Sequence, residues 1–417
     1  GLIGRDGSKV NDLPSYVVSN INADGELSKK VDNKPHNWDN VVQLNENNVV
    51  LMTRMWADLY RYKTGRIKKK QDVDKWLDVL KVLRQDIKEL TESKLRRLHK
   101  SSVELAGKTT IDIIGMGSIL QLYTEKDSGR LYGDGYLNLQ TLPKEMRYIA
   151  MGGLEYYEYD IENAHYNILY QYNKMVKGPV LNKIKEYITD TNGVREQISN
   201  EIGVRIELVK KVLIPIIYGA TMDKSWRVID GVQSDSAIYE KCMDYTDGDR
   251  TEAQELWNRF KGNDMVVGLT NDVKRAYKHI KKSWITTTKG KRLKNVRNKT
   301  INIYEVDDRT GKVKEKSCGK LLSHLLQGIE SVVVLYIISE DNQSFVMPHH
   351  DGWVSKKNWD TDTIEKIIKA QTTRVMNDYS PILYGFDLKI KKIKLNNPIL
   401  GDWTETLVKK GIDGVLV

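Results

Sequence analysis

The stretches that decide the fold are EYYEYDIENAH at residues 155–165 and SFVMPHHDGWVSK at residues 344–356. The first is an aromatic-rich alternating run that ends near Asp160, which is typical of a strand followed by a helix. The second predicts a hairpin with Asp351 near its tip. A strand end and a hairpin tip can meet on one face of a sheet, so these two patterns allow Asp160 and Asp351 to lie close together.

Helical periodicity dominates the sequence around these two stretches. Residues 71–100 carry apolar side chains at spacings of three and four, from Val73 to Leu90, which predicts helix packed through that stripe. Residues 300–316 predict a hairpin, and residues 383–396 alternate as an edge strand. Further helices are expected at 48–63, 163–176, 193–219 (as a pair), 240–285, 319–340 and 361–377. The expected fold class is therefore α+β.

Composition and charge narrow the classes of function. The 417 residues are 40% hydrophobic and 29% charged, which argues against disorder and allows two or three domains. No stretch approaches the ~18 apolar residues that a spanning helix needs, so no membrane partner is expected. The net charge is +10, and basic runs at 66–70, 94–100 and 289–299 indicate a polyanionic partner. Each run is also compatible with a solvated helix face or loop.

The cysteines and the N-terminus indicate the setting of the protein. Cys242 and Cys318 are too few for a disulfide framework or a zinc site, so reduced thiols in an intracellular compartment are expected. The first residues, GLIGRDGSKVND, contain no initiator Met and no apolar signal segment. They indicate a processed end or an excised domain. Residues 1–47 are expected to form an irregular N-terminal arm.

Four separated segments carry the residues best suited to chemistry. The first is TEKDSGR at 124–130, with NLQTLP following at 138–143. The second is YDIENAH at 159–165, at a strand-to-helix junction. The third is KKVLIPIIYG at 210–219. The fourth combines QG at 327–328 with HHDG at 349–352.

In this order and spacing, the four segments resemble the catalytic domain of the family A DNA polymerases and of the related single-subunit, phage-type RNA polymerases. The resemblance covers roughly residues 120–355. Single motifs such as His-Asp occur by chance, but four in the correct order are specific. The resemblance implies a right-hand fold with an antiparallel palm sheet and mainly helical fingers and thumb. Its parts would be a thumb-like region at 48–120, palm at 121–189, fingers with a hairpin at 190–316, and palm with the C-terminal region at 317–417.

The resemblance also implies a metal site. Template-directed phosphoryl transfer uses two Mg²⁺ ions, which prefer carboxylates, substrate phosphates and water as ligands. The positions implied are Asp160, Ile161 and Asp351, and Mn²⁺ is a possible substitute. Structural roles also fit: Asp160 suits the N-cap of the following helix, and Asp351 suits a turn before glycine.

Nucleotide binding is assigned by the resemblance to the 210–219 segment. Lys210 and Tyr218 are expected to be catalytic; on a helix they share a face within about 80°. Lys210 would bind the triphosphate, Tyr218 would stack at the nascent base pair, and Gly219 would admit the template. Lys211 is a further nucleotide-binding candidate, although paired lysines also suit an exposed basic face. The family has an arginine four residues before this lysine, whereas Arg205 stands five before it.

Contacts to primer and template are implied for a further set of polar residues, although ordinary surface polarity explains each of them as well. Gln327 would contact the minor groove of the growing duplex. The complete set is Arg130, Asn138, Gln140, Gln327 and His350.

The sugar preference is less clear from the sequence. Five residues after the first aspartate, the DNA polymerases carry Glu and the RNA polymerases carry Gly. This chain has His165, which is large enough to exclude a 2′-hydroxyl but also suits a buried structural role. Against deoxynucleotides, Gly352 stands where the DNA enzymes usually have Glu, Ile214 replaces an aromatic residue, and Lys210-Lys211 resembles the RNA enzymes.

Three functional hypotheses follow. The first is a DNA polymerase core that adds dNTPs to a primer on a nucleic-acid template. The alternative is a single-subunit DNA-directed RNA polymerase. From another class, a non-catalytic nucleic-acid-binding protein would use the basic runs and the 22 Tyr and 9 Trp for stacking. No exonuclease carboxylate set is recognisable, so we expect a viral, plasmid-like or excised core, with an accessory subunit as a possible partner.

Overall fold

The chain adopts an α+β fold of small antiparallel sheets and many helices, as the sequence predicts. The computed structural model describes residues 37–83, 85–111, 117–134, 138–229, 232–287, 290–307, 311–340, 343–380 and 384–395. Most of the predicted N-terminal arm, part of the third basic run and the turn of the 300–316 hairpin lie outside the described residues.

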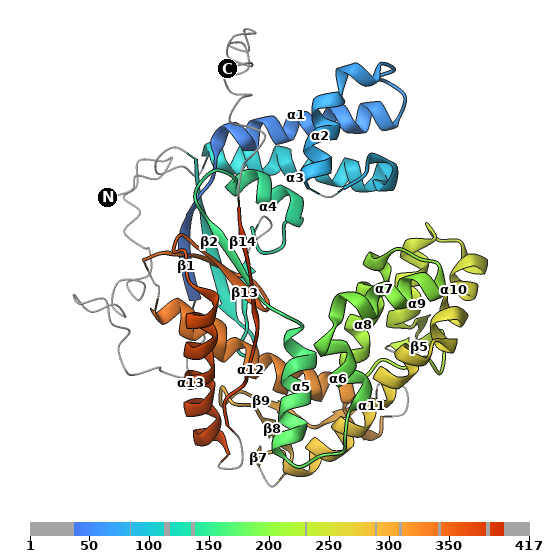
Figure 1. Ribbon diagram of the computed structural model, residues 1–417, viewed down its shortest axis with the longest axis vertical. Helices are drawn as coiled ribbons and strands as arrows, with labels where there is room; N and C mark the ends of the chain where they lie inside the picture. Colours follow the sequence, from blue (N-terminus) through green and yellow to red (C-terminus); the bar gives the residue numbers. More distant parts are fainter. Residues whose placement is uncertain are drawn as a thin grey trace.

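A four-stranded antiparallel sheet in the order β12-β13-β4-β14 lies at the centre of the fold. The predicted strand, hairpin and edge strand are therefore confirmed, and they pair with one another (Figure 1). The strands are β4 (Tyr157–Ile161), β12 (Phe345–Pro348), β13 (Gly352–Ser355) and β14 (Ile390–Lys394).

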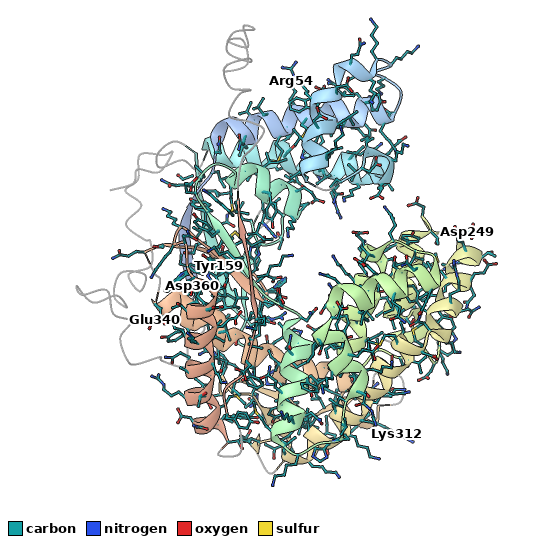
Figure 2. All side chains as sticks on the ribbon, viewed as in Figure 1. Arg54, Tyr159, Asp249, Lys312, Glu340 and Asp360 are labelled. Carbon is teal, nitrogen blue, oxygen red and sulfur yellow. The ribbon has the colours of Figure 1, made fainter. Side chains whose placement is uncertain are left out.

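Alternation along β4 separates the two faces of this sheet. Tyr159 and Ile161 point into one hydrophobic core, where Tyr159 stacks on Trp353 of β13 with ring centroids 5.2 Å apart. Figure 2 labels Tyr159 within the central sheet region. Glu158 and Asp160 point to the opposite face. The strand therefore contributes to the core and presents carboxylates at the same time.

A second hydrophobic core belongs to the N-terminal helices and a three-stranded sheet. Helix α3 packs against α1, and Trp56 and Trp76 are almost fully buried between these elements. The helices gather at one end of the molecule (Figure 1). The elements are β1 (Asn37–Gln43), α1 (Glu46–Lys63), η1 (Lys70–Asp72), α2 (Asp74–Val82), η2 (Ile87–Glu89), α3 (Glu92–Ile111), β2 (Ser118–Glu125), β3 (Leu131–Asp134) and α4 (Lys144–Met151).

Two local expectations for this region were wrong. Residues 37–43 of the expected irregular arm form β1, because β2 offers an antiparallel partner along its whole length. The apolar stripe from Val73 to Leu90 is buried at both ends, but its helix ends at Val82. The chain turns through η2, where the Asp86 side chain accepts from the Lys88 amide, and this turn allows α3 to return along α1.

The other helical group follows β4, and its expected helices are confirmed. These helices and the central sheet share the first core. Three small sheets, β5-β6, β7-β8-β9 and β10-β11, lie between the helices in sequence. The elements are α5 (Ala164–Met175), α6 (Asn182–Thr189), α7 (Thr191–Ile202), α8 (Ile206–Ile217), β5 (Trp226–Ile229), β6 (Val232–Asp235), α9 (Ala237–Tyr245), α10 (Arg250–Gly262), α11 (Asp264–Ile280), η3 (Lys281–Ser283), β7 (Thr286–Thr287), β8 (Arg292–Lys294), β9 (Thr300–Asn302), β10 (Tyr304–Val306) and β11 (Val313–Glu315).

The last two helices complete the core beneath the sheet. They are α12 (Cys318–Glu340) and α13 (Thr361–Tyr379), which pack on each other. By length and composition alone, α12 could cross a membrane, but 78% of its most apolar window is buried inside the protein. Its apolar side chains join both hydrophobic cores, so α12 serves as a core helix.

Candidate active site

Asp160 and Asp351 lie next to each other across two paired strands. Asp160 is opposite Gly352 in the β4–β13 register, and the Ile161 amide donates to the Asp351 carbonyl at 2.9 Å. The two carboxyl side chains are close enough that, after burial, the charge of Asp351 raises the pKa of Asp160. The proximity that the strand end and the hairpin tip allow is therefore present, and Ile161 brings its main chain to the same place.

Asp160 and Asp351 are buried close to other acidic side chains, and this raises the pKa of both. Burial, followed by the charges of Asp351 and Glu158, raises the pKa of Asp160 to about 8, against the opposing charge of Lys144. Burial and the charge of Glu330 also raise the pKa of Asp351. Each carboxylate therefore disfavours ionisation of the other, and a bound cation would remove that repulsion.

The residues fit a Mg²⁺ site of the kind completed by a substrate. Among the residues that the structure describes, no group of three or more His, Cys, Asp or Glu side chains could hold a metal alone. Two carboxylates and a main-chain carbonyl leave coordination positions for water and phosphate oxygens, which is the arrangement that Mg²⁺ prefers. The donor set at Asp160, Ile161 and Asp351 suits such an ion.

Gly352 allows the two strands to approach each other. A Cβ atom at this position would lie 2.0 Å from the Tyr159 carbonyl oxygen and 3.0 Å from the Asp160 Cα atom. A larger residue would push β13 away from β4 and separate the aspartates.

The aspartates open onto a pocket of ≈ 770 Å³. One wall is the end of β4 with the start of α5, and the other is the face of α8 that carries Lys210 and Tyr218. Residues 187–192 and Arg195 from α6 and α7, together with Arg130, the 349–352 turn and Lys391 of β14, complete the lining. Of the predicted site residues, the pocket collects Asp160, Ile161, Asp351, Lys210, Tyr218, His165, Arg130 and His350.

Lys210 is the exposed cation of α8 that lines this pocket. Burial lowers its pKa, and the positive charges of Arg195, Lys391 and Lys144 lower it further. Glu207 opposes them by raising the pKa. An ammonium surrounded by like charges is well placed for a polyanionic ligand.

Tyr218 ends α8 and is held by a buried polar network. Its hydroxyl lies 2.6 Å from His165 Nδ1, and the His165 Nε2 atom lies 2.7 Å from Glu330 Oε2. Burial raises the pKa of the Tyr218 hydroxyl, and Gln327 lies close enough to lower it in part. Arg130 forms an ion pair with Glu330. His165 is therefore fixed through both ring nitrogens, which limits how far its ring can turn away from the pocket.

Sequence reasoning missed Glu330 and Arg195. Glu330 is fully buried in α12, and its signal was a lone acid within a long apolar run, three residues after Gln327. Arg195 lines the pocket from α7 and donates to Asn163 Oδ1 at 3.0 Å and to Tyr187. The motif directed attention to an arginine just before Lys210, whereas the arginine beside Lys210 comes from the preceding helix.

Several predicted residues lie outside the pocket lining. Arg205 forms an ion pair with Glu89 at 2.8 Å and stacks on Tyr245. Lys211 is exposed, and Gly219 terminates α8 with a positive φ of 78°. Their nucleotide contacts remain predictions.

Asn138 and Gln140 are buried, and they brace the strands near the aspartates. Gln140 accepts from the Gly133 amide and donates to the Leu131 carbonyl and, at 3.4 Å, to the Pro348 carbonyl beside the 349–352 turn. The Asn138 side chain accepts from the Gln140 amide. A contact of either residue with nucleic acid remains a prediction.

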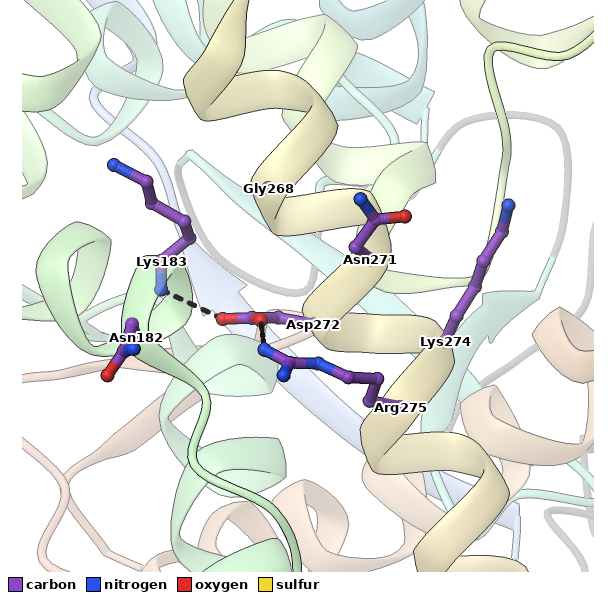
Figure 3. A pocket seen from close by; sticks show the side chains of 7 residues that line it. All are labelled: Asn182, Lys183, Gly268, Asn271, Asp272, Lys274 and Arg275. Atoms are coloured by element: carbon purple, nitrogen blue, oxygen red, sulfur yellow. Dashed lines mark hydrogen bonds and ion pairs between the residues drawn. The ribbon is translucent and has the colours of Figure 1, made fainter.

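A second pocket, of ≈ 630 Å³, lies between the start of α6 and α11 (Figure 3). Asp272 accepts from the Lys183 and Ile184 amides and forms an ion pair with Arg275. The negative charge of Asp272 is therefore already compensated within the protein. This pocket is a junction between two helices.

Comparison with known proteins adds little to this geometry. The chain matches no protein-family model and no curated protein. Among solved structures, the POL domain of Pol1 from M. smegmatis, in complex with DNA primer-template and dNTP, is similar over 85% of this chain and 67% of that chain. The TM-score is 0.45 and the sequence identity is 12%.

Proposed function

We propose that the chain is a template-directed nucleotidyltransferase, a family A-like DNA polymerase core that adds dNTPs to a primer 3′-hydroxyl. In this proposal the central sheet is the palm, residues 190–316 are the fingers, and residues 48–120 are the thumb. The observation that carries the proposal is the contact between Asp160 and Asp351 at the base of a pocket whose facing helix presents Lys210 and Tyr218.

The residues divide the work between the two walls of the pocket. Asp160, Asp351 and the Ile161 carbonyl would hold two divalent ions. When bound, such ions lower the pKa of the attacking hydroxyl and offset charge on the leaving group. A bond forms between the 3′-oxygen and the α-phosphorus, the bond to pyrophosphate breaks, and its electron pair leaves with pyrophosphate.

The facing helix would orient the nucleotide. Lys210 would pair with the triphosphate, and its lowered pKa favours donation of a proton to the departing pyrophosphate. Tyr218 would support the nascent base pair. His165, fixed by Glu330 and Tyr218, would stand where a 2′-hydroxyl would otherwise fit, which favours deoxynucleotides. Most of the rate enhancement would come from positioning and charge neutralisation.

The test is Mg²⁺-dependent extension on primed and unprimed DNA and RNA templates, with dNTPs and then NTPs. We expect dNTP addition to a primer that Asp351→Asn abolishes while primer-template binding, measured by fluorescence anisotropy, is retained. Asp249→Asn is the matched control, because Asp249 only caps α10 and asparagine also caps well.

The outcomes separate the rival functions. Efficient NTP addition on unprimed DNA would identify an RNA polymerase instead. Salt-sensitive binding without any incorporation would indicate a non-catalytic binding protein. Extension by Asp351→Asn at the wild-type rate would overturn the assignment of the aspartates.

A further inference from the structure

Four lysines lie on or directly before strand β14, and three of them are engaged with the protein. Lys389 pairs with Glu365 at 2.6 Å, Lys392 donates to the Trp359 carbonyl at 2.7 Å, and Lys394 pairs with Glu155 at 2.7 Å. Lys391 differs from these neighbours. It is exposed and lines the active-site pocket, and across the described ranges no carboxylate lies within ion-pair distance of its ammonium.

The sheet register places Lys391 beside the aspartates. Lys391 is the cross-strand partner of Asp160, and Gly352 is the partner of Asp160 on its other side. Directly opposite residues in antiparallel strands project from the same face. Because glycine has no side chain, the face around Asp160 is open on one side and carries a lysine on the other.

Lys391 and Lys210 line the same pocket from different walls. Lys391 belongs to the sheet and Lys210 to α8, yet the charge of Lys391 lowers the pKa of Lys210. Arg195 and Lys144 add to this effect. The acids Glu162 and Asp190 also line the pocket, but neither forms an ion pair with Lys391 in the described structure. Lys391 and Lys210 both line the open pocket, and neither forms an ion pair with a described residue, so together they fit a ligand with several negative charges.

We infer that Lys391 binds the β- and γ-phosphates of the incoming nucleotide from the sheet side, opposite Lys210. This inference rests on the proposed function, and it adds a triphosphate contact from the C-terminal strand. The lysine holds the group that becomes pyrophosphate, and its charge stabilises the electron pair that pyrophosphate carries away. It transfers no proton in this scheme.

The test compares Lys391→Gln with Lys389→Gln, which changes an exposed lysine directly before β14 that pairs with Glu365 and does not line the pocket. We expect Lys391→Gln to raise the KM for dNTP about tenfold, equivalent to about 1.4 kcal/mol. The KM for pyrophosphate in the reverse reaction should rise similarly, while the Kd for primer-template stays unchanged. Lys391→Arg should restore most of the nucleotide affinity, and Lys389→Gln should behave as wild type.

The readouts separate this inference from the proposed function. If the wild type extends primers and Lys391→Gln keeps its dNTP KM, the inference fails and the function stands. An equal loss of primer-template affinity would assign Lys391 to the nucleic acid and also overturn the inference. Calorimetric titration of the protein with dATP in the presence of Ca²⁺ measures nucleotide binding without catalysis. Loss of dATP binding in Lys391→Gln supports the inference even if no extension occurs. Absence of dATP binding by the wild type would overturn both.

Discussion

The two faces of the central sheet differ in the interactions that they hold, although they share the same strands. On one face, Tyr159, Ile161 and Trp353 are at most 1% exposed and stack into the core. On the other face, Asp160 faces Asp351 with its pKa raised to about 8. The first face supplies stability through burial. The second face also packs Val354 and Met347 into the other core, but beside them it holds like charges together at a cost in stability. Alternation along a single strand allows both.

The largest expected effect is a change on the charged face. Asp160→Asn should lower nucleotide incorporation by about 10³-fold, because it removes a ligand for the divalent ions. The same change removes a buried carboxyl whose raised pKa costs stability at neutral pH, so the free energy of unfolding without divalent metal should not fall. Steady-state extension and denaturant unfolding measure the two effects. Mg²⁺ should raise the Tm of the wild type but not of this variant.

Next in size is a change on the core face. Trp353→Ala should lower the free energy of unfolding by about 3–5 kcal/mol, because it removes a fully buried indole that stacks on Tyr159. Urea unfolding followed by circular dichroism gives the value. A loss below about 1 kcal/mol would contradict the claim that burial on the Tyr159–Trp353 face stabilises the protein.

A smaller effect is expected at Gly352, where β13 passes close to β4 beside Asp160. Gly352→Ala should destabilise the protein by about 1–3 kcal/mol and reduce extension, since its Cβ would collide with the Tyr159 carbonyl and move β13. Gly262→Ala is the control, because a Cβ there meets nothing within 4 Å. Wild-type activity in Gly352→Ala would show that strand spacing does not set the distance between the aspartates.

The smallest expected effect concerns the sugar. His165→Gly should increase the preference for NTP over dNTP about tenfold, because it opens the space beside Tyr218. Competition between labelled NTP and dNTP in single-nucleotide addition measures the ratio. His279→Gln, which changes a histidine bonded to the Val176 carbonyl on α11, should leave the ratio unchanged. An unchanged ratio in His165→Gly would assign His165 a structural role.

Local patterns alone predicted much of this protein. Alternation identified β4 and β14, the apolar period identified α12, and the spacing of Lys210 and Tyr218 placed both on one side of α8. Such patterns succeed because strand and helix geometry depend on neighbours in sequence. The same reasoning failed after Val82, where the packing of α3 on α1 requires a turn that apolar spacing does not encode.

The sequence by itself determined which residue types could bind metal and phosphate and in which order they occur. Only the tertiary structure decided which of them meet. It joined Asp160 to Asp351 through strand register, brought Lys391 from the C-terminal strand and Arg195 from another helix beside Lys210, and buried Glu330 against His165. These contacts join residues distant in sequence, and their geometry is set by sheet pairing and core packing, which no local pattern records.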